Sequence, residues 1–294
     1  MIKCIYHNPC LDGFASYLTV KMKYGFDKVE GIPVNYRITD VADVLDKVTS
    51  EDDVIITDFS FSQSDLLKLK ECVRSLVVLD HHLTSERNLN GLYFCVFDRN
   101  KSGCTLTWEY LFQDEPIPKL FQYIEDHDLW RHKLPHVEEL IASLKTYPLD
   151  ENLWWEQFLL GEEEAISQLI AEGKSIGRYQ RNIVDKFILM SKNNLLQIVN
   201  MDGHSVPIIN SNHLASEIGS ALSKKHPFVV VYFDDDKLRN FELRSSRENP
   251  RSVDVSIVAE KFGGGGHKHA AGFRIEKNFK KLKELGLLFL EDGG

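Results

Sequence analysis

Two short segments that lie far apart in the sequence carry residue types suited to phosphate chemistry. Asp80, His81 and His82 directly follow an apolar run, and a run of four glycines, residues 263–266, directly precedes His267. A carboxylate and two imidazoles at the end of a buried strand can hold a divalent metal beside a substrate phosphate. Glycines let backbone N–H groups close on an anion. Together the two segments indicate a metal-assisted reaction at a phosphate group.

Three more clusters of acidic and imidazole side chains follow apolar runs in the same way. They suggest one shared site of hard oxygen and nitrogen ligands, which suits Mn²⁺ or Mg²⁺ better than zinc. A helix N-cap or a surface turn is the alternative for each cluster, and for Asp80 and His127 in particular. The clusters are His7, Cys10 and Asp12, then Asp58, then Asp126, His127 and Asp128.

The N-terminal third of the chain alternates strand-like and helix-like segments, which predicts a largely parallel α/β sheet. Ligands of such sheets gather beyond the carboxyl ends of the strands, and the polar clusters fall there. Predicted strands cover residues 2–6, 32–36, 54–59, 76–79 and 93–97. Predicted helices cover 13–24, 41–48, 63–73, 105–112, 119–124 and 137–144.

A long helical segment, residues 162–190, separates this region from a second one. Gly173 and Gly177 are its weak points, and it is suited to link two domains. Beyond it we predict strands at 195–200, 206–210, 228–233, 240–244 and 272–275 and helices at 215–223 and 255–261, with the basic stretch 280–283 exposed on a terminal helix. The predicted fold class is α/β: an N-terminal parallel-sheet domain joined by a helical linker to a smaller α/β domain.

Composition and charge narrow the classes of function. The 294 residues suffice for two domains, and 43% apolar and 27% charged residues are ordinary for a soluble globular protein. The net charge of −9 argues against broad binding of long duplexes, which needs a basic surface. The five cysteines form no C-x-x-C pair, and no apolar run approaches the roughly 18 residues that span a membrane. Without a secretory signal pattern, a cytoplasmic location is expected.

In their order along the chain, these motifs resemble the DHH phosphoesterase family, with its C-terminal DHHA1 substrate domain. The resemblance covers nearly the whole chain. It implies a DHH metal-binding catalytic domain at residues 1–160, a helical linker at 161–193 and a DHHA1 substrate-binding domain at 194–294. It also implies a Mn²⁺-dependent phosphohydrolase with two ions in its site, Mg²⁺ or another divalent cation being the alternative.

The resemblance also assigns roles to the N-terminal clusters. The mechanism it implies is hydrolysis in which two cations lower the pKa of water. By residue, Asp58 resembles the aspartate that bridges both metals, His7 a ligand of the first metal, Asp12 a ligand of the second, His81 a metal-binding imidazole, His82 the imidazole facing the scissile phosphate, Asp80 the carboxylate orienting those histidines, and Asp126 the last ligand, with Asp128 as a close rival.

Cys10 departs from the family pattern, because many members have another aspartate at this position. A thiolate is softer than a carboxylate and favours zinc over manganese. If Cys10 is a ligand, the first metal site is altered, weak or singly occupied. The alternative is that Cys10 only fills the turn.

The C-terminal glycine run is expected to contact the nucleotide end of the substrate, with a flexible hairpin as the alternative. An upstream arginine is expected to hold phosphate, because a forked guanidinium matches phosphate oxygens. Arg247 and Arg251 are weaker choices that surface charge also explains. The residues expected to contact the substrate are Arg244, Gly264, Gly265, Gly266 and His267.

Three functions remain open from the sequence. The first is a metal-dependent phosphodiesterase or exonuclease that hydrolyses short oligonucleotides or linear dinucleotides. The second is a nucleotide phosphatase acting on substrates of the 3′-phosphoadenosine 5′-phosphate (pAp) type. The third is a nucleotide-binding regulatory protein with weakened catalysis, although the retained ligand residues weigh against it. The expected partner is a short single-stranded nucleic acid or a dinucleotide, with no membrane, and a homodimer is one option for the assembly.

Overall fold

The computed structural model describes residues 1–35 and 40–278 of the chain. It divides into two compact units at the Gly177–Arg178 boundary. Within the described residues, none of the helices combines the length and the apolar character needed to cross a membrane. Each unit has its own sheet and its own hydrophobic core.

The first unit is built on a five-stranded sheet whose strand pairs are all parallel, as the sequence predicts. Its order is β2-β1-β3-β4-β5. Apolar residues, many of them β-branched, fill the central strands and are buried on both faces, as expected for a parallel sheet covered by helices. The strands are β1 (Ile2–His7), β2 (Val29–Val34), β3 (Asp53–Thr57), β4 (Ser75–Asp80) and β5 (Cys95–Phe97).

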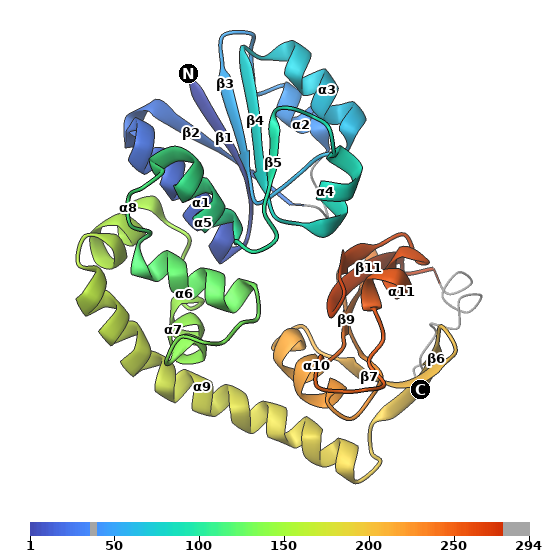
Figure 1. Ribbon diagram of the computed structural model, residues 1–294. Helices are drawn as coiled ribbons and strands as arrows, with labels where there is room; N and C mark the ends of the chain where they lie inside the picture. Colours follow the sequence, from blue (N-terminus) through green and yellow to red (C-terminus); the bar gives the residue numbers. More distant parts are fainter. Residues whose placement is uncertain (36–39, 279–294) are drawn as a thin grey trace. The chain divides into compact units, whose positions relative to one another are not determined.

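Helices cover both faces of this sheet (Figure 1). On one face α1 (Leu11–Tyr24), α5 (Gly103–Phe112), α6 (Lys119–Asp128) and α7 (Val137–Leu144) contribute to one core. On the other face α2 (Val41–Leu45) and α3 (Gln63–Cys72) contribute to a second core. The remaining elements of this unit are the 3₁₀ helix Phe26–Lys28, α4 (Leu83–Leu89), α8 (Glu151–Leu153) and the π-helix Trp154–Leu159.

A single helix, α9 (Glu162–Lys192), runs through the boundary between the units. Gly173 and Gly177, expected to be weak points, lie within it without breaking it. Gly173 has a packing role instead, because a Cβ there would lie 1.7 Å from the backbone oxygen of Glu139. Past the boundary, Val184 and Phe187 pack against the core of the second unit.

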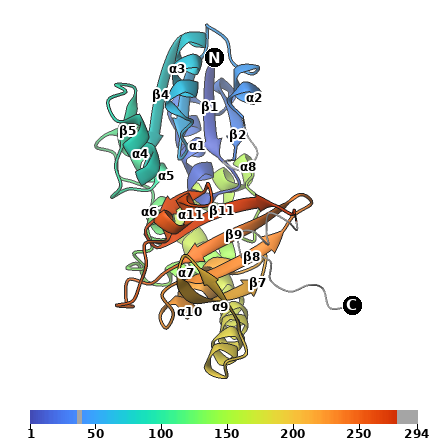
Figure 2. The same cartoon turned by 90° about the vertical axis from the view of Figure 1, so that its right-hand side faces the viewer.

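The second unit contains a six-stranded mixed sheet in the order β10-β11-β9-β8-β7-β6. Strands β7 and β8 are parallel, and the other pairs are antiparallel. Figure 2 shows β11, β9, β8 and β7 side by side. The elements are β6 (Gln197–Met201), β7 (His204–Asn210), α10 (Ala215–Ser223), β8 (Val229–Asp234), β9 (Leu238–Arg244), α11 (Val255–Glu260), β10 (Gly265–His267) and β11 (Ala270–Glu276).

The predicted elements are confirmed where the structure describes them, with shifts of a few residues at their ends. The elements that were not predicted are the 3₁₀ helix Phe26–Lys28, α4, α8, the π-helix Trp154–Leu159 and the short strand β10. Tyr36, the last residue of one predicted strand, and the basic stretch 280–283 lie outside the described residues.

Candidate metal centre

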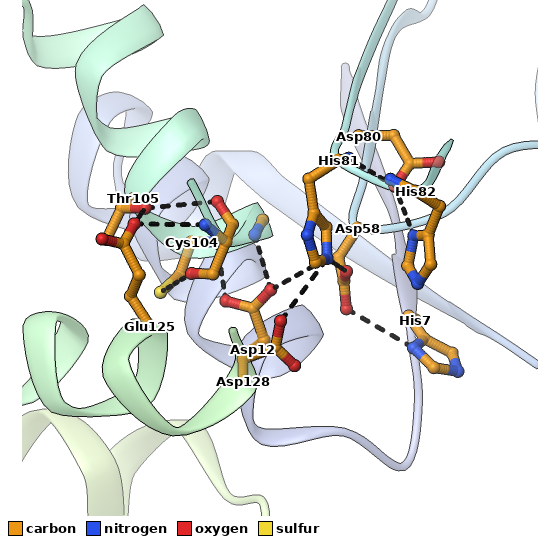
Figure 3. Close-up of polar contacts among 12 residues, drawn as sticks. His7, Asp12, Asp58, Asp80, His81, His82, Cys104, Thr105, Glu125 and Asp128 are labelled. Atoms are coloured by element: carbon orange, nitrogen blue, oxygen red, sulfur yellow. Dashed lines mark hydrogen bonds and ion pairs between the residues drawn. The ribbon is translucent and has the colours of Figure 1, made fainter. Parts of the chain in front are cut away.

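Three neighbouring strands of the first sheet end at the same level and deliver the candidate ligands there. Thr57 pairs with Tyr6 on one side and with Leu79 on the other, so the next residues of all three strands lie together. Asp58 has a left-handed backbone with φ of 53°, and its N–H donates to the Leu79 carbonyl at 2.9 Å. This turn directs the Asp58 carboxylate toward residues from the neighbouring strands (Figure 3).

Asp58 is the centre of the cluster. One of its carboxylate oxygens lies 3.1 Å from Nε2 of His81, and the other lies 3.4 Å from Nδ1 of His7. His82 and His7 lie on one side of Asp58, and Asp12 lies on the other (Figure 3). A carboxylate whose two oxygens face two different imidazoles is arranged as a bridge between two sets of ligand atoms.

The second set of ligand atoms comes from helices. Nε2 of His81 is 3.8 Å from Oδ2 of Asp12 on α1 and 3.6 Å from Oδ2 of Asp128 at the end of α6. These three residues offer ligand atoms that all lie within 4.8 Å of one another, and so do His7, Cys10 and Asp58. A third group, formed by Asp58, Asp80, His81 and His82, meets the same criterion, so the potential metal groups adjoin at Asp58 and His81.

Helix α5 fixes the position of Asp12. The carboxylate accepts N–H groups from Gly103 at 2.5 Å and Cys104 at 2.9 Å, both in the first turn of α5. A Cβ on Gly103 would lie 2.5 Å from Cβ of Asp58 and 2.9 Å from Oδ2 of Asp12. Gly103 is thus a site residue that the sequence analysis missed. In the structure Gly103 directly follows the N-cap Ser102, but a glycine there resembles an ordinary helix start and the helix was predicted only from residue 105.

The charges of the cluster conflict in the absence of a cation. Burial, then the nearby Asp58 and Asp128 carboxylates, raises the pKa of Asp12 to about 7. Burial also raises the pKa of Asp128. For Asp58, burial opposes ionisation, but hydrogen bonds from His7 and His81 outweigh it and hold its pKa below the usual range. Buried carboxylates that face one another need a compensating positive charge. This oxygen-rich donor set fits a divalent cation such as Mn²⁺ or Mg²⁺.

Asp80 holds the neighbouring histidine in place, and its carboxylate also lies within 4.8 Å of a carboxylate oxygen of Asp58. Its Oδ1 lies 2.6 Å from Nδ1 of His82 and also accepts the His81 backbone N–H at 2.8 Å. Its Oδ2 accepts the hydroxyl of Ser60 at 2.6 Å. Burial opposes ionisation of Asp80, but His82 outweighs it and lowers the pKa to about 2. Asp80 is therefore a carboxylate that orients the His82 ring.

The structure gives the two aspartates of α6 different contacts. The Asp126 carboxylate is absent from the potential metal groups of the described residues, and it accepts backbone N–H groups from Lys133 and Leu134, each at 2.9 Å. Asp128 is the one that reaches His81. Residues two positions apart on a helix differ by about 200° around its axis. Only one of Asp126 and Asp128 can therefore face the site. Asp126 instead stabilises the loop after α6, and Asp128 replaces it as the candidate ligand.

Cys10 occupies the N-cap position of α1, but its side chain makes no capping hydrogen bond. It belongs to the same potential metal group as His7 and Asp58. Burial, followed by Asp58 and the other carboxylates, raises the pKa of its thiol well above the usual value. Without a cation, the thiol is therefore protonated at neutral pH. That Cys10 binds metal stays a prediction.

In the second unit, Arg244 is engaged within the protein. Its guanidinium donates to the Ser216 hydroxyl at 2.7 Å and to the Leu243 carbonyl at 3.0 Å. It also pairs with Glu242 at 3.0 Å, and its side chain is 14% exposed. A Cβ on Gly219 would lie 2.7 Å from Cγ of Arg244, so helix α10 packs closely over it. Three polar contacts and this packing leave little of the guanidinium for a ligand.

A different set of basic side chains lines a cavity of about 570 Å³ in the second unit. Arg247 and Lys268 supply positive charge there, and His269 lies beside them. Nδ1 of His269 is 3.0 Å from the Ser245 hydroxyl, which anchors the ring. Arg247 was a weaker choice from the sequence, yet it lines this cavity, whereas Arg244 and Arg251 do not.

The glycine run forms the turn and edge strand beside β11. A Cβ on Gly264 would lie 2.1 Å from the Gly272 oxygen, and one on Gly266 would lie 2.6 Å from the Ala270 oxygen. Gly265 differs, because a Cβ there would meet nothing within 4 Å. His267 pairs with Ala270 in the hairpin. Two of these glycines are therefore required for strand packing, and Gly265 has open space above it.

Residues 197–289 match the DHHA1 domain family. The chain is 33% identical over 309 residues to the uncharacterized protein R106 of Acanthamoeba polyphaga mimivirus, which covers 97% of this chain and 71% of that protein. It is 26% identical over 313 residues to oligoribonuclease NrnB of Bacillus subtilis (strain 168), and the match covers 95% of this chain and 74% of that protein. It is also similar to the structure of RecJ from Thermus thermophilus in complex with Mn²⁺, with a TM-score of 0.49 and 17% identity. That match covers 97% of this chain and 51% of the RecJ chain.

Proposed function

Because the chain belongs to the DHH/DHHA1 phosphoesterase family, we propose that it is a divalent-metal-dependent phosphodiesterase of short oligonucleotides or linear dinucleotides. The observation that carries the proposal is the shared Asp58 carboxylate, whose two oxygens face His7 and His81. One side chain that serves two ligand groups is what hydrolysis assisted by two metals requires.

We propose that His7, Cys10 and Asp58 form the first metal group and that Asp58, Asp12, His81 and Asp128 form the second. Mn²⁺ is the proposed ion, with Mg²⁺ as the alternative, because most of the donors are hard. Bound there, the cations would lower the pKa of a water molecule and neutralise charge on the phosphoryl oxygens.

The side chains of the site would then divide the remaining work. His82 is held by Asp80 through Nδ1, so its ring keeps one orientation and can donate a proton through Nε2 to a phosphoryl or leaving oxygen. The Ser60 hydroxyl and the backbone N–H groups of His81 and His82 keep Asp80 in place. The first turn of α5 keeps Asp12 aimed at His81 without a further side chain. Such fixed groups need little reorganisation during the reaction.

The preference for short substrates is supported by the charge and by a relative. An acidic chain with a net charge of −9 disfavours long polymers, and one relative bears the name oligoribonuclease. We propose residues 1–160 as the catalytic domain, 161–193 as the helical linker and 194–294 as the substrate domain. Within the latter, Arg247 and Lys268 supply a phosphate contact, while contacts from Arg244, Gly264, Gly265, Gly266 and His267 stay predictions.

The test is a substrate panel incubated with Mn²⁺, Mg²⁺ or excess chelator and resolved by chromatography. It contains RNAs and DNAs of graded length, linear and cyclic dinucleotides, and pAp. We expect hydrolysis of the shortest oligonucleotides or linear dinucleotides, and none in chelator. Asp58→Asn is the variant that tests the metal bridge. Asparagine also tolerates a left-handed backbone, so the fold should be kept. The activity of this variant should fall at least about 10³-fold with an unchanged circular dichroism spectrum. Turnover of pAp alone, or full activity in chelator, would contradict the proposal.

A further inference from the structure

A cavity of about 400 Å³ adjoins the metal centre inside the first unit. At one end it is lined by Cys10, Asp12 and Asp128, which belong to the candidate ligand set. Pockets for small molecules usually begin at about 300 Å³, so this cavity has room for one compact ligand rather than a polymer. The cavity is formed by α1, α6 and the segment after α7, and it needs no residue from the second unit.

A lysine lines the same cavity. Lys145 directly follows α7, and its Nζ lies 3.4 Å from Nε2 of His127, the residue before Asp128. Among the described residues that line the cavity, it is the one lysine or arginine. The ammonium group donates to the imidazole, which keeps the positive charge close to α6. An anion that enters a cavity containing two carboxylates will therefore be drawn toward Lys145.

Apolar side chains form much of the remaining wall. Leu11, Tyr147 and Leu149 all line the cavity. The Tyr147 ring is fixed from behind, because its hydroxyl donates to Glu172 at 2.8 Å and its ring packs edge-on against Phe158 at 5.1 Å. A fixed aromatic face beside two leucines suits a flat or ring-shaped group such as a base or sugar.

We propose that this cavity is a subsite for one nucleoside monophosphate unit of the substrate, with its phosphate on Lys145 and its nucleoside against Tyr147 and Leu149. The inference rests on the proposed function, since the unit would lie directly beside the bond that is cleaved. It accounts for the joint presence of an apolar wall and a cation next to the acidic ligand set. It also means that the first structural unit of the protein, rather than the second, recognises the nucleotide next to the scissile bond.

The first experiment measures binding and needs no turnover. Isothermal titration calorimetry of the full-length protein in Mg²⁺ buffer, with AMP and with adenosine, separates the phosphate contact from the nucleoside contact. Lys145→Met should weaken AMP roughly tenfold and leave adenosine unchanged, because a charge-assisted contact is lost. Lys145→Arg should retain AMP binding. Lys47→Met removes the same charge from an exposed site after α2, on the other face of the sheet, and should change neither affinity.

Leu149→Ala tests the apolar wall and should weaken AMP and adenosine by the same factor. The subsite is wrong if Lys145→Met leaves AMP affinity unchanged, or if it weakens adenosine as much as AMP. It is equally wrong if wild type binds neither ligand.

Kinetics then separate this inference from the proposed function. With pApA as substrate, Lys145→Met should raise KM roughly tenfold and change kcat less than about twofold, which is the pattern of a lost uniform contact. An equal fall in kcat at constant KM would overturn the subsite while leaving the phosphodiesterase intact. Failure of wild type to cleave any substrate would refute the proposed function, yet Lys145-dependent binding of AMP would still establish the subsite.

Discussion

The two units use their polar motif residues in opposite ways. In the first, the buried Asp12 and Asp58 and the half-buried Asp128 all approach the buried His81. In the second, Arg244 pairs with its neighbour Glu242, and Gly264 makes room for a strand. The first arrangement has unresolved charge, whereas in the second the charge of Arg244 is compensated within the protein.

This difference separates residues kept for chemistry from residues kept for folding. Like charges buried side by side oppose folding unless a ligand compensates them, so their presence points to a function. A paired arginine, or a glycine in contact with a neighbouring backbone, is explained by the fold alone. The test of a motif residue is therefore what its side chain faces once the chain is folded.

Among the paired comparisons, the largest expected effect comes from the same substitution made at two positions of α6. Asp128→Asn should lower activity about 10²- to 10³-fold and weaken Mn²⁺, because Asp128 faces His81. Asp126→Asn should instead lower the free energy of unfolding by about 1 kcal/mol, because it weakens the acceptor of the Lys133 and Leu134 N–H groups. Metal titration and urea unfolding of both variants measure this. A loss of metal affinity in Asp126→Asn alone would restore the sequence prediction.

Two adjacent glycines provide the second comparison. Gly264→Ala should destabilise the protein by about 3 kcal/mol, because its Cβ would overlap the backbone oxygen of Gly272. Gly265→Ala should change stability by less than about 0.5 kcal/mol, because its Cβ enters open space. Its KM should rise if the substrate approaches there. Thermal unfolding and steady-state kinetics distinguish these effects. Equal stability losses would show that the whole run serves packing.

Arg244 and Arg247 form the third pair. Arg244→Ala should cost about 2 kcal/mol of stability, because it removes one donor from Glu242 and from Ser216. Arg247→Ala should leave the unfolding midpoint unchanged and raise KM, because Arg247 lines the basic cavity. Denaturant curves and KM values for both variants decide the matter. If Arg244→Ala raises KM with unchanged stability, the original choice of phosphate contact is correct.

The buried carboxylates should make the metal-free protein sensitive to pH. With a pKa of about 7, folded Asp12 keeps a proton that unfolded aspartate loses near pH 3.9. The folded state thus binds more protons between these values, and the free energy of unfolding falls as the pH rises. Asp128 and His81, whose pKa values are also raised, act in the same direction.

In chelator, stability should therefore fall by about 3 kcal/mol between about pH 5 and pH 8. Added Mn²⁺ should remove most of this loss, and so should Asp12→Asn. Asp58 does not contribute in this window, because its pKa is lowered and its stabilisation is lost only below about pH 4. Melting temperatures measured across this range provide the test. A melting temperature that rises with pH in chelator would contradict the charge conflict.

Cys10 carries the smallest expected effect. Cys10→Asp should tighten Mn²⁺ about tenfold, because a hard carboxylate replaces a thiol that is protonated without metal. Cys10→Ser should change little if the thiol only fills the turn, and should weaken metal binding if the thiolate is a ligand. Mn²⁺ titrations of the three proteins compare these outcomes. Unchanged affinity in both variants would place Cys10 outside the ligand set.

The alternation of apolar runs and helical periods was enough to predict the parallel sheet and the edge at which the site lies. Strand ends of a parallel sheet share one edge, so polar residues after β1, β3 and β4 must gather there. That argument needs only local pattern and chain order. It also identified His7, Asp58 and His81 as members of one cluster.

Tertiary structure decided what local pattern leaves open. The choice of Asp128 over Asp126 depends on how α6 is rotated about its axis, and packing sets that rotation. Gly103 matters only because α5 begins against Asp12 and Asp58, which are distant in the sequence. Arg244 and Arg247 have the same chemistry, and burial against Gly219 and Glu242 distinguishes them. Residue types and spacing determine which side chains can reach a site, whereas the packing of distant elements determines which of them face it.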